Sequence, residues 1–343
     1  MTTMDAEAFG WMPDGQEVRR VTIQGGGLTA NILNWGAVIQ DLRLSGHSAP
    51  LVLGFEDFRF YPVHSPYFGA IAGRYANRIS GGRFTIDGKT YQTDLNFLGK
   101  HTLHGGGAAM GQQLWALKES GADFVTLTYH ARDGEMGFPG NLLVTCTYRV
   151  MPPGRLVVEL SAETDAPTVC NLAAHSYFNL DDGGQSDVLG HLMRIDADTY
   201  LPVDAELIPT GEVLPVSGTE FDFRAIRPVC KGDASLYKPY DINFCLSDER
   251  KPLRWVASAR GARSGVEMEV WTTEVGVQFY DGANVGRDVP GLNGVTYGLH
   301  AGLCLEPQFW PDAPNQPNFP SSVLRPDAPY AQTTEYRFKL GLQ

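Results

Sequence analysis

The clearest structural signal in this chain of 343 residues is the stretch Leu142-Leu143-Val144-Thr145-Cys146-Thr147-Tyr148-Arg149-Val150. Its even-numbered residues are all apolar or aromatic, whereas most of its odd-numbered residues are polar. Successive side chains of a β-strand point to opposite faces, so this alternation predicts a strand with one buried face.

The same alternation recurs along the chain, and no segment shows the period of a helix of ordinary length. We expect further strands near residues 18–24, 28–34, 37–44, 124–129, 155–163, 266–270 and 302–305. Tight-turn sequences separate these segments, among them Asp87-Gly88, Asp133-Gly134 and Pro152-Pro153-Gly154. The content of 39 glycines and 22 prolines suits many strands joined by turns. The chain is therefore predicted to be all-β and antiparallel.

The domain organisation follows from what the chain lacks. It contains no low-complexity linker, no repeat at a fixed period and no shift in composition, so residues 1–343 are predicted to form a single large antiparallel β-sandwich. The segment Pro307–Pro329 carries too many prolines for a strand ladder, and we expect an ordered surface loop there, with a flexible loop as the alternative.

Charge and hydropathy exclude several classes of partner. With 27 Lys and Arg against 39 Asp and Glu, the net charge is −12, which opposes binding to nucleic acid and to anionic membrane surfaces. No apolar run approaches the length of a membrane span, and the first twenty residues lack an export signal. We expect a cytoplasmic protein. Its five scattered cysteines are interpreted as buried thiols.

Several catalytic and cofactor motifs fail on spacing. Residues 82–90 resemble a phosphate-binding loop, but five residues separate the two glycines and the pattern indicates a hairpin. Gly105, Gly107 and Gly111 miss the dinucleotide-binding spacing by one residue, and Ser186 lacks the glycines of a nucleophile elbow. We therefore expect no nicotinamide or flavin cofactor and no serine hydrolase chemistry.

A metal site is also not expected. His101 and His104 lie three residues apart, but the sequence has no H-E-x-x-H motif and no obvious third ligand beside either histidine.

One candidate binding segment is Gly69–Ile79, which sets Arg74, Asn77 and Arg78 among small apolar residues. An unpaired guanidinium is expensive to bury, so something must accept these donors. A ligand is one possibility, and internal carboxylates or a hydrated loop are the other.

Three further segments place a titratable group in a special setting. His104 precedes a flexible glycine turn, His175 lies within an apolar and aromatic stretch, and Glu306 ends an apolar strand. Burial would disfavour the charged form of Glu306 and so raise its pKa, which is how the pKa of a general base is brought toward the working pH. A surface turn, a satisfied core histidine and a buried ion pair are the structural alternatives.

Asp241 and Gln278 complete the candidate set. Each stands beside aromatic residues, in Asp241-Ile242-Asn243-Phe244 and Gln278-Phe279-Tyr280. Hydrogen-bonding groups next to a flat apolar surface are the mixture that sugar hydroxyls require. Either residue alone is equally compatible with the end of an ordinary strand.

Taken together and in order, these segments resemble the aldose 1-epimerase (galactose mutarotase) family. The resemblance rests on residues 73–79 (GRYANRI), 103–106 (LHGG), 175–180 (HSYFNL) and Leu305-Glu306, and extends from Asn34 to the region of residues 317–321. It implies a galactose mutarotase-like supersandwich with the site in an open cleft, and an isomerase that interconverts the α and β anomers of free aldoses.

The resemblance also implies a role for each matching residue. Glu306 would be the general base at the anomeric hydroxyl, and His175 the acid that protonates the ring oxygen. Asn77, Arg78, His104, Asp241 and Gln278 would bind the sugar, while Phe279, Tyr280 and Trp310 are candidate stacking partners. Such a reaction requires no metal and no cofactor, and its partner is a monosaccharide.

Two alternatives stay open from the sequence. A carbohydrate hydrolase or lyase would use a second carboxylate, for which Asp241 is the evident candidate. A sugar-binding protein would keep the cleft without the chemistry. Asp327-Ala328, Ser176 and Pro307 depart from common family residues, which leaves the preferred sugar open. We expect a monomer or a homodimer.

Overall fold

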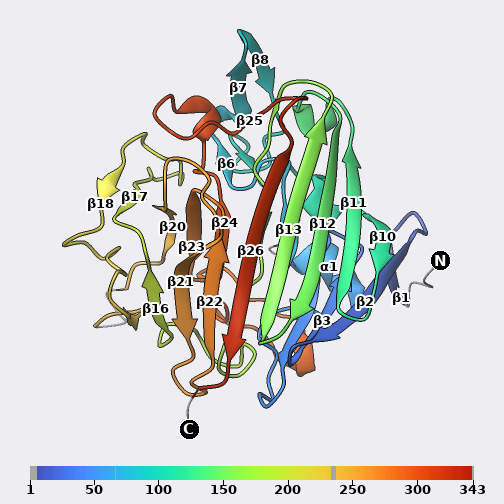
Figure 1. Ribbon diagram of the computed structural model, residues 1–343, viewed down its shortest axis with the longest axis vertical. Helices are drawn as coiled ribbons and strands as arrows, with labels where there is room; N and C mark the ends of the chain where they lie inside the picture. The colour runs from blue at the N-terminus through green and yellow to red at the C-terminus, as the bar shows by residue number, and fades with distance from the viewer. Residues whose placement is uncertain (1–5, 66, 233–236, 342–343) are drawn as a thin grey trace.

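The computed structural model describes residues 6–65, 67–232 and 237–341. Its architecture is a β-sandwich dominated by one large antiparallel sheet, which faces the viewer in Figure 1. Two smaller sheets cover the other side of this sheet. The prediction of an all-β antiparallel sandwich is confirmed.

The large sheet has nine strands in the order β10-β11-β12-β13-β26-β22-β21-β16-β19. The strands are β10 (Ala116–Ser120), β11 (Phe124–Ala131), β12 (Leu142–Met151), β13 (Arg155–Thr164), β26 (Tyr330–Lys339), β22 (Glu267–Thr272), β21 (Arg254–Arg260), β16 (Leu192–Ile195) and β19 (Arg227–Pro228). The strongest sequence signal forms β12, which pairs with β13 across the predicted Pro152-Pro153-Gly154 turn.

The two covering sheets have four and five strands. The first contains β1 (Ala6–Trp11), β2 (Glu17–Gly25), β3 (Leu28–Leu33) and β4 (Ile39–Leu44) in that order. The second, in spatial order, contains β18 (Leu214–Pro215), β17 (Thr199–Leu201), β20 (Asp241–Cys245), β23 (Gly276–Tyr280) and β24 (Cys304–Gln308).

Short strand pairs and helical turns complete the chain. The pairs are β5 (Ile71–Ala72) with β15 (Ala173–Ala174), β6 (Arg78–Ile79) with β9 (Thr102–Leu103), β7 (Arg83–Ile86) with β8 (Lys89–Gln92), and β14 (Thr168–Val169) with β25 (Val323–Leu324). The helical elements are α1 (Tyr61–His64), η1 (Phe58–Phe60), η2 (Ser80–Gly82), η3 (Met110–Gln112), η4 (Glu135–Gly137), η6 (Leu292–Gly294) and η7 (Ala313–Asn315). The predicted hairpin at residues 82–90 is the pair β7 and β8.

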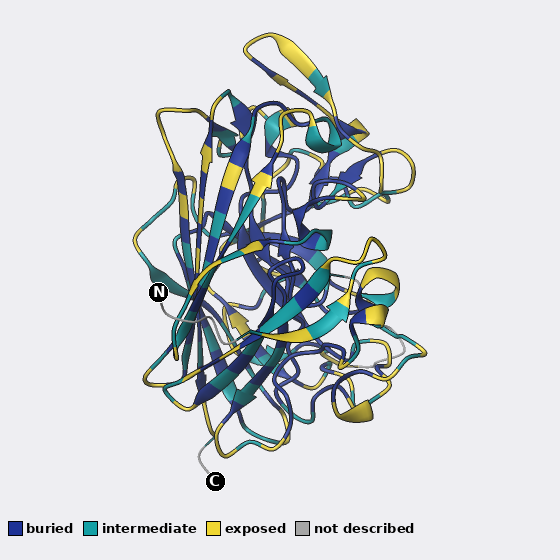
Figure 2. Ribbon diagram, turned by 90° about the vertical axis from the view of Figure 1, so that its right-hand side faces the viewer, coloured by how far each residue is buried: buried dark blue, intermediate teal, exposed yellow. Residues whose placement is uncertain are grey.

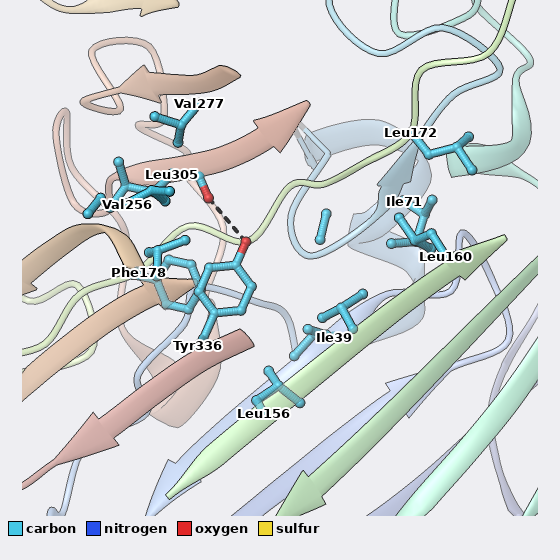
Figure 3. Close-up of a cluster of buried hydrophobic side chains, with 14 of the residues drawn as sticks. Ile39, Ile71, Leu156, Leu160, Leu172, Phe178, Val256, Val277, Leu305 and Tyr336 are labelled. Carbon is cyan, nitrogen blue, oxygen red and sulfur yellow. Dashed lines mark hydrogen bonds between the residues drawn. The ribbon is translucent and has the colours of Figure 1, made fainter. Parts of the chain in front are cut away.

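The hydrophobic core lies between the large sheet and the covering sheets, where Figure 2 shows the buried residues. One contiguous cluster of buried side chains runs from Val21 to Phe338. Figure 3 shows part of it, where Tyr336 of β26 donates a hydrogen bond to the carbonyl oxygen of Leu305 on β24 at 3.1 Å. This bond ties the large sheet to the five-stranded sheet.

Alternation along β24 separates the core from the site. Leu305 points into the core, so Glu306 points to the opposite face of the five-stranded sheet. In the register of that sheet, Glu306 stands opposite Gln278, and Gln278 stands opposite Asn243. Directly opposite residues of antiparallel strands share a face, so these three polar side chains form a row across three strands.

The proline-rich segment differs partly from its prediction. Pro307 belongs to β24 and pairs with Val277, and β25 lies within the segment that was expected to be only a loop. Proline is tolerated at position 307 because β24 is the edge strand of its sheet. Four of the five cysteines are buried as expected, and Cys230 is half-buried.

No helix of the described residues is long and apolar enough to cross a membrane.

Candidate functional site

His175 and Glu306 are brought together by a short antiparallel contact between distant segments. The backbone of Phe178 exchanges two hydrogen bonds with Leu303, N to O at 2.7 Å and O to N at 2.9 Å. His175 lies three residues before Phe178 and Glu306 three residues after Leu303, so the two side chains occupy matching positions along this contact. The predicted acid and base are therefore neighbours.

The Nε2 atom of His175 lies 3.6 Å from Oε2 of Glu306. The side chain of Glu306 is 2% exposed, and no hydrogen-bond donor of the described residues reaches its Oε2 atom. Burial raises the pKa of the Glu306 carboxyl well above its ordinary value, and the nearby Asp241 raises it further, while Arg78 opposes both. The carboxyl group is thus tuned toward holding a proton.

Two tyrosine rings hold the imidazole of His175 between them. Tyr67 stacks at a centroid distance of 6.0 Å with an interplanar angle of 23°, and Tyr177 at 5.1 Å with an angle of 22°. The edge of His104 closes a third side at 5.1 Å. Burial lowers the pKa of His175 to about 4, so the ring is a weak base when the site is empty.

Cys304 lies on the other side of the imidazole, with its Sγ atom 3.6 Å from Nδ1 of His175. Burial raises the pKa of its thiol well above the ordinary value, and Glu306 adds to the effect. One ligand atom each from His175, Cys304 and Glu306 lies within 4.8 Å of the others. This mixed nitrogen, sulfur and oxygen set is close enough to hold a divalent cation. Sequence spacing did not reveal it, because the three residues come from two segments.

Asp241 organises the rim of the site. Its Oδ1 atom accepts a hydrogen bond from Nε2 of Gln278 at 2.6 Å, and its Oδ2 atom accepts one from Nη2 of Arg78 at 3.0 Å. The Arg78 guanidinium also stacks on the ring of Phe97 at 4.6 Å. Arg78 therefore pairs with an internal carboxylate and still borders the site.

Asn77 and His104 form a compact corner beside this rim. The Asn77 backbone N–H donates to Nδ1 of His104 at 3.1 Å, which leaves the proton of the neutral ring on Nε2. Asn77 has φ 64° and His104 has φ 51°, in the left-handed region where asparagine and histidine occur more often than most residues. Burial lowers the pKa of His104 well below its ordinary value, with His175 and Arg78 adding to it.

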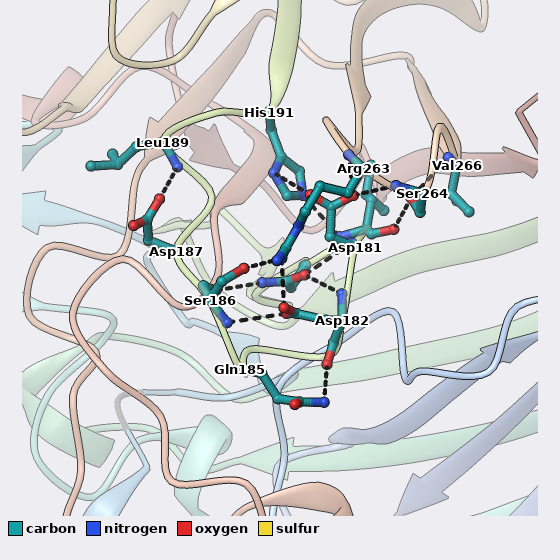
Figure 4. Close-up of polar contacts among 12 residues, drawn as sticks. Asp181, Asp182, Gln185, Ser186, Asp187, Leu189, His191, Arg263, Ser264 and Val266 are labelled. Carbon is teal, nitrogen blue, oxygen red and sulfur yellow. Dashed lines mark hydrogen bonds and ion pairs between the residues drawn. The ribbon is translucent and has the colours of Figure 1, made fainter.

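A polar network anchors the chain just after His175 (Figure 4). Leu180 donates its backbone N–H to Nε2 of His191 at 3.0 Å. Asp181 accepts backbone N–H groups of Arg263 at 3.0 Å and Ser264 at 2.8 Å through Oδ1. These contacts fix the far end of the 175–180 segment to the turn between β21 and β22, and so hold the imidazole in place.

The rim residues line a narrow cavity. Its walls are formed by Asn77, Arg78, Leu201, Val203, Leu207, Pro209, Asp241, Asn243, Gln278 and Pro311. Glu306 lies beside it, next to Gln278 in the strand row. The resemblance implied an open cleft, whereas here the acid and base are buried beside a small opening. A larger hollow lined by Thr219, Arg227 and Tyr240 has no such pair among the lining residues that the structure describes.

All seven predicted site residues thus cluster in one region, but one of the suggested stacking partners was wrong. Phe279 is fully buried and packs against Phe223 and Tyr240, so it is not a stacking partner. Arg74 is also structural, because it donates to the carbonyl oxygens of Pro139 and Gly140.

Sequence reasoning missed Tyr67 as a neighbour of the imidazole. The only signal for it was its place two residues before the glycine-rich segment that begins at Gly69.

An all-β sandwich that places one carboxyl and one imidazole beside a hydrogen-bonding rim has the parts of a proton-transferring isomerase. The family model for aldose 1-epimerase matches residues 19–337. The chain belongs to the aldose 1-epimerase family, and the prediction of an isomerase of this class is confirmed.

Curated relatives carry names within the same family. The galactose mutarotases of Mus musculus and Homo sapiens are each 41% identical to this chain, over 99% of it and 100% of their own length. The aldose 1-epimerase of Escherichia coli K12 is 35% identical over 95% of the chain and 96% of its own length. Among solved structures, a GalM/aldose epimerase homologue from C. elegans superposes with a TM-score of 0.88 at 29% identity, over 95% of this chain and 100% of that one.

Proposed function

We propose that this protein interconverts the anomers of free aldoses such as galactose and glucose, with Glu306 as general base and His175 as general acid. Glu306 takes the proton of the anomeric hydroxyl while His175 protonates the ring oxygen, and the C1–O5 bond breaks to give the open-chain aldehyde. After rotation about C1–C2, the reverse transfers close the ring on the other face. The observation that carries this proposal is the 3.6 Å separation of Nε2 and Oε2.

The pKa directions of the two groups define how many protons the site must hold. Burial favours the neutral form of each group, so below the raised pKa of Glu306 the empty site carries one proton, on the carboxyl of Glu306. The reactive arrangement, an ionised carboxylate with an imidazolium, holds the same single proton. Moving that proton from Glu306 to His175 therefore prepares the site without any exchange with solvent.

The rim supplies the hydrogen bonds that hold the sugar. We propose that Asn77, Arg78, His104, Asp241 and Gln278 bind its ring oxygen and hydroxyls. In support, Arg78 and Gln278 already converge on the two oxygens of Asp241, so these polar groups are fixed before the sugar arrives. Fixed partners reduce the ordering that binding requires. Positioning and proton transfer are enough for this reaction, in which no electrons are transferred.

The direct test is polarimetry on freshly dissolved α-D-galactose and α-D-glucose. We expect the purified protein to accelerate the approach to anomeric equilibrium, and Glu306→Gln to abolish most of that acceleration. Saturable sugar binding with no acceleration by the wild-type protein would favour a sugar-binding role. Release of reducing sugar from a glycoside, without anomer exchange, would favour a hydrolase.

We also propose that the chain is one folding unit, cytoplasmic, and either a monomer or a homodimer. The single cluster of buried side chains between Val21 and Phe338 supports the first statement. A single cooperative unfolding transition tests it, sedimentation velocity tests the oligomeric state, and cell fractionation tests the location.

A further inference from the structure

Asn243 lies in the site but has no role in the chemistry described above. Its side chain is 2% exposed and lines the same cavity as Asp241 and Gln278. Neither its Oδ1 nor its Nδ2 atom has a hydrogen-bond partner among the described residues. Burying an amide without hydrogen-bond partners is unfavourable. Asn243 therefore offers an unused donor and an unused acceptor at the wall of the sugar cavity.

The position of this amide depends on a glycine in the neighbouring strand. A Cβ atom built on Gly276 would lie 2.8 Å from Oδ1 and 3.1 Å from Nδ2 of Asn243, and 3.0 Å from Cδ1 of Trp310. The amide thus occupies the space that a side chain at position 276 would need. The φ angle of Gly276 is not positive, so alanine fits its backbone and would act by displacing the amide of Asn243 and the ring of Trp310.

The distance between Asn243 and the reacting carbon follows from the row of opposite residues across the five-stranded sheet. Glu306, Gln278 and Asn243 stand opposite one another on β24, β23 and β20. Adjacent strands are about 4.8 Å apart, so the first and third members of the row are about 10 Å apart at the backbone. A pyranose ring with a hydroxyl at either end, and a hydrogen bond of about 2.8 Å at each, spans such a gap.

We propose that Asn243 binds the hydroxyl of C4 and is a further substrate-binding residue of this site. With C1 at Glu306, the ring atom directly across the pyranose is C4, which the row directs toward β20. The amide of Asn243 both donates and accepts, so it can form hydrogen bonds in both directions with a C4 hydroxyl. Glucose and its C4 epimer galactose both carry this hydroxyl, so both sugars offer Asn243 the group that it binds. This inference rests on the proposed anomer exchange.

The test compares sugars with and without the C4 hydroxyl, in the wild-type protein and in Asn243→Leu, which keeps the volume and removes both polar atoms. We expect kcat/KM for D-glucose and D-galactose to fall about tenfold in the variant, through loss of one hydrogen bond. For 4-deoxy-D-glucose, the wild-type and the variant should be nearly equal. Gly276→Ala should reproduce this pattern, and Asn31→Leu on β3 serves as a control distant from the site.

Thermal unfolding separates binding from a structural role. The side chain of Asn243 makes no hydrogen bond within the described residues, so Asn243→Leu should keep or raise the melting temperature. Equal losses for D-glucose and 4-deoxy-D-glucose would overturn the inference, as would an unchanged kcat/KM for all three sugars. If the wild-type protein exchanges no anomers, the proposed function fails first, and that result is distinguishable because it does not depend on Asn243.

Discussion

The imidazole of His175 faces the carboxyl group of Glu306 across 3.6 Å, at matching positions on either side of the contact between Phe178 and Leu303. This separation is longer than a direct hydrogen bond, so neither group satisfies the other. Burial disfavours the charged form of each group. Substrate oxygens are the groups that can join both, which is why the pair suits proton transfer better than it suits stability.

Glu306→Gln should reduce turnover by roughly 10²–10⁴ while sugar binding is largely kept. The amide has nearly the shape of the carboxyl group but does not accept the anomeric proton. Polarimetric progress curves over a range of galactose concentrations separate the two effects, with binding followed by calorimetry. Turnover close to that of the wild-type protein would remove Glu306 from the mechanism.

The same substitution should stabilise the protein at neutral and alkaline pH. Because burial raises the pKa of Glu306 above its usual 4.5, the folded protein holds this proton more tightly than the unfolded chain does. Wild-type stability therefore falls as the pH rises above 4.5 toward the raised folded value. Glutamine does not titrate, so the two melting temperatures should agree at acidic pH and separate as the pH rises. A difference that is constant with pH would contradict this account.

Much of the fold was predictable because its signals are local. The alternation at Leu142–Val150 and the turn at Asp87-Gly88 each lie within one hairpin, and both form as predicted. The meeting of His175 and Glu306 is different, because pairing of distant segments leaves no trace in residue spacing. Only the family resemblance placed them together. Asn243 escaped notice for a related reason, since an amide in a strand becomes informative only when its lack of partners is visible.

His175→Asn should lose turnover to a similar degree and gain tolerance to acid. The unfolded chain takes up a proton at this position near pH 6.5, whereas the folded protein does so only near 4. Wild-type stability therefore declines as the pH falls from 6.5 to 4, by about 3 kcal/mol at the lower end. The variant lacks this loss, so denaturant titrations at pH 7 and pH 4 should show a smaller change for it. An equal change in stability between pH 7 and pH 4 in both proteins would contradict the lowered pKa of His175.

Tyr67 should act by holding the plane of the His175 ring. Tyr67→Phe keeps the stacked ring and should keep nearly full turnover. Tyr67→Leu lets the imidazole tilt, and a misplacement of this kind is expected to cost roughly 10- to 100-fold in kcat. In the proposed mechanism the site holds one proton, so uptake of a second proton by His175 sets the acidic limb of the rate profile near the pKa of this ring, about 4. Opening the site to water should move this limb toward the ordinary value of 6.5. A rise in KM alone, with kcat and the acidic limb of the rate profile unchanged, would show that Tyr67 only contributes to binding.

The two buried arginines of the segment Gly69–Ile79 should affect different properties when they are substituted. Arg74 donates to the carbonyl oxygens of Pro139 at 2.7 Å and Gly140 at 2.8 Å, so Arg74→Lys leaves a buried acceptor unpaired and should cost about 2 kcal/mol of stability. Its folded fraction should keep the wild-type kcat/KM. Arg78 instead pairs with Asp241 at the cavity, so Arg78→Lys should raise KM for galactose with a smaller loss of stability. Urea unfolding measures the stability of both variants, and polarimetry measures their KM. If both variants lost mainly stability, or both mainly showed a raised KM, these different roles would be contradicted.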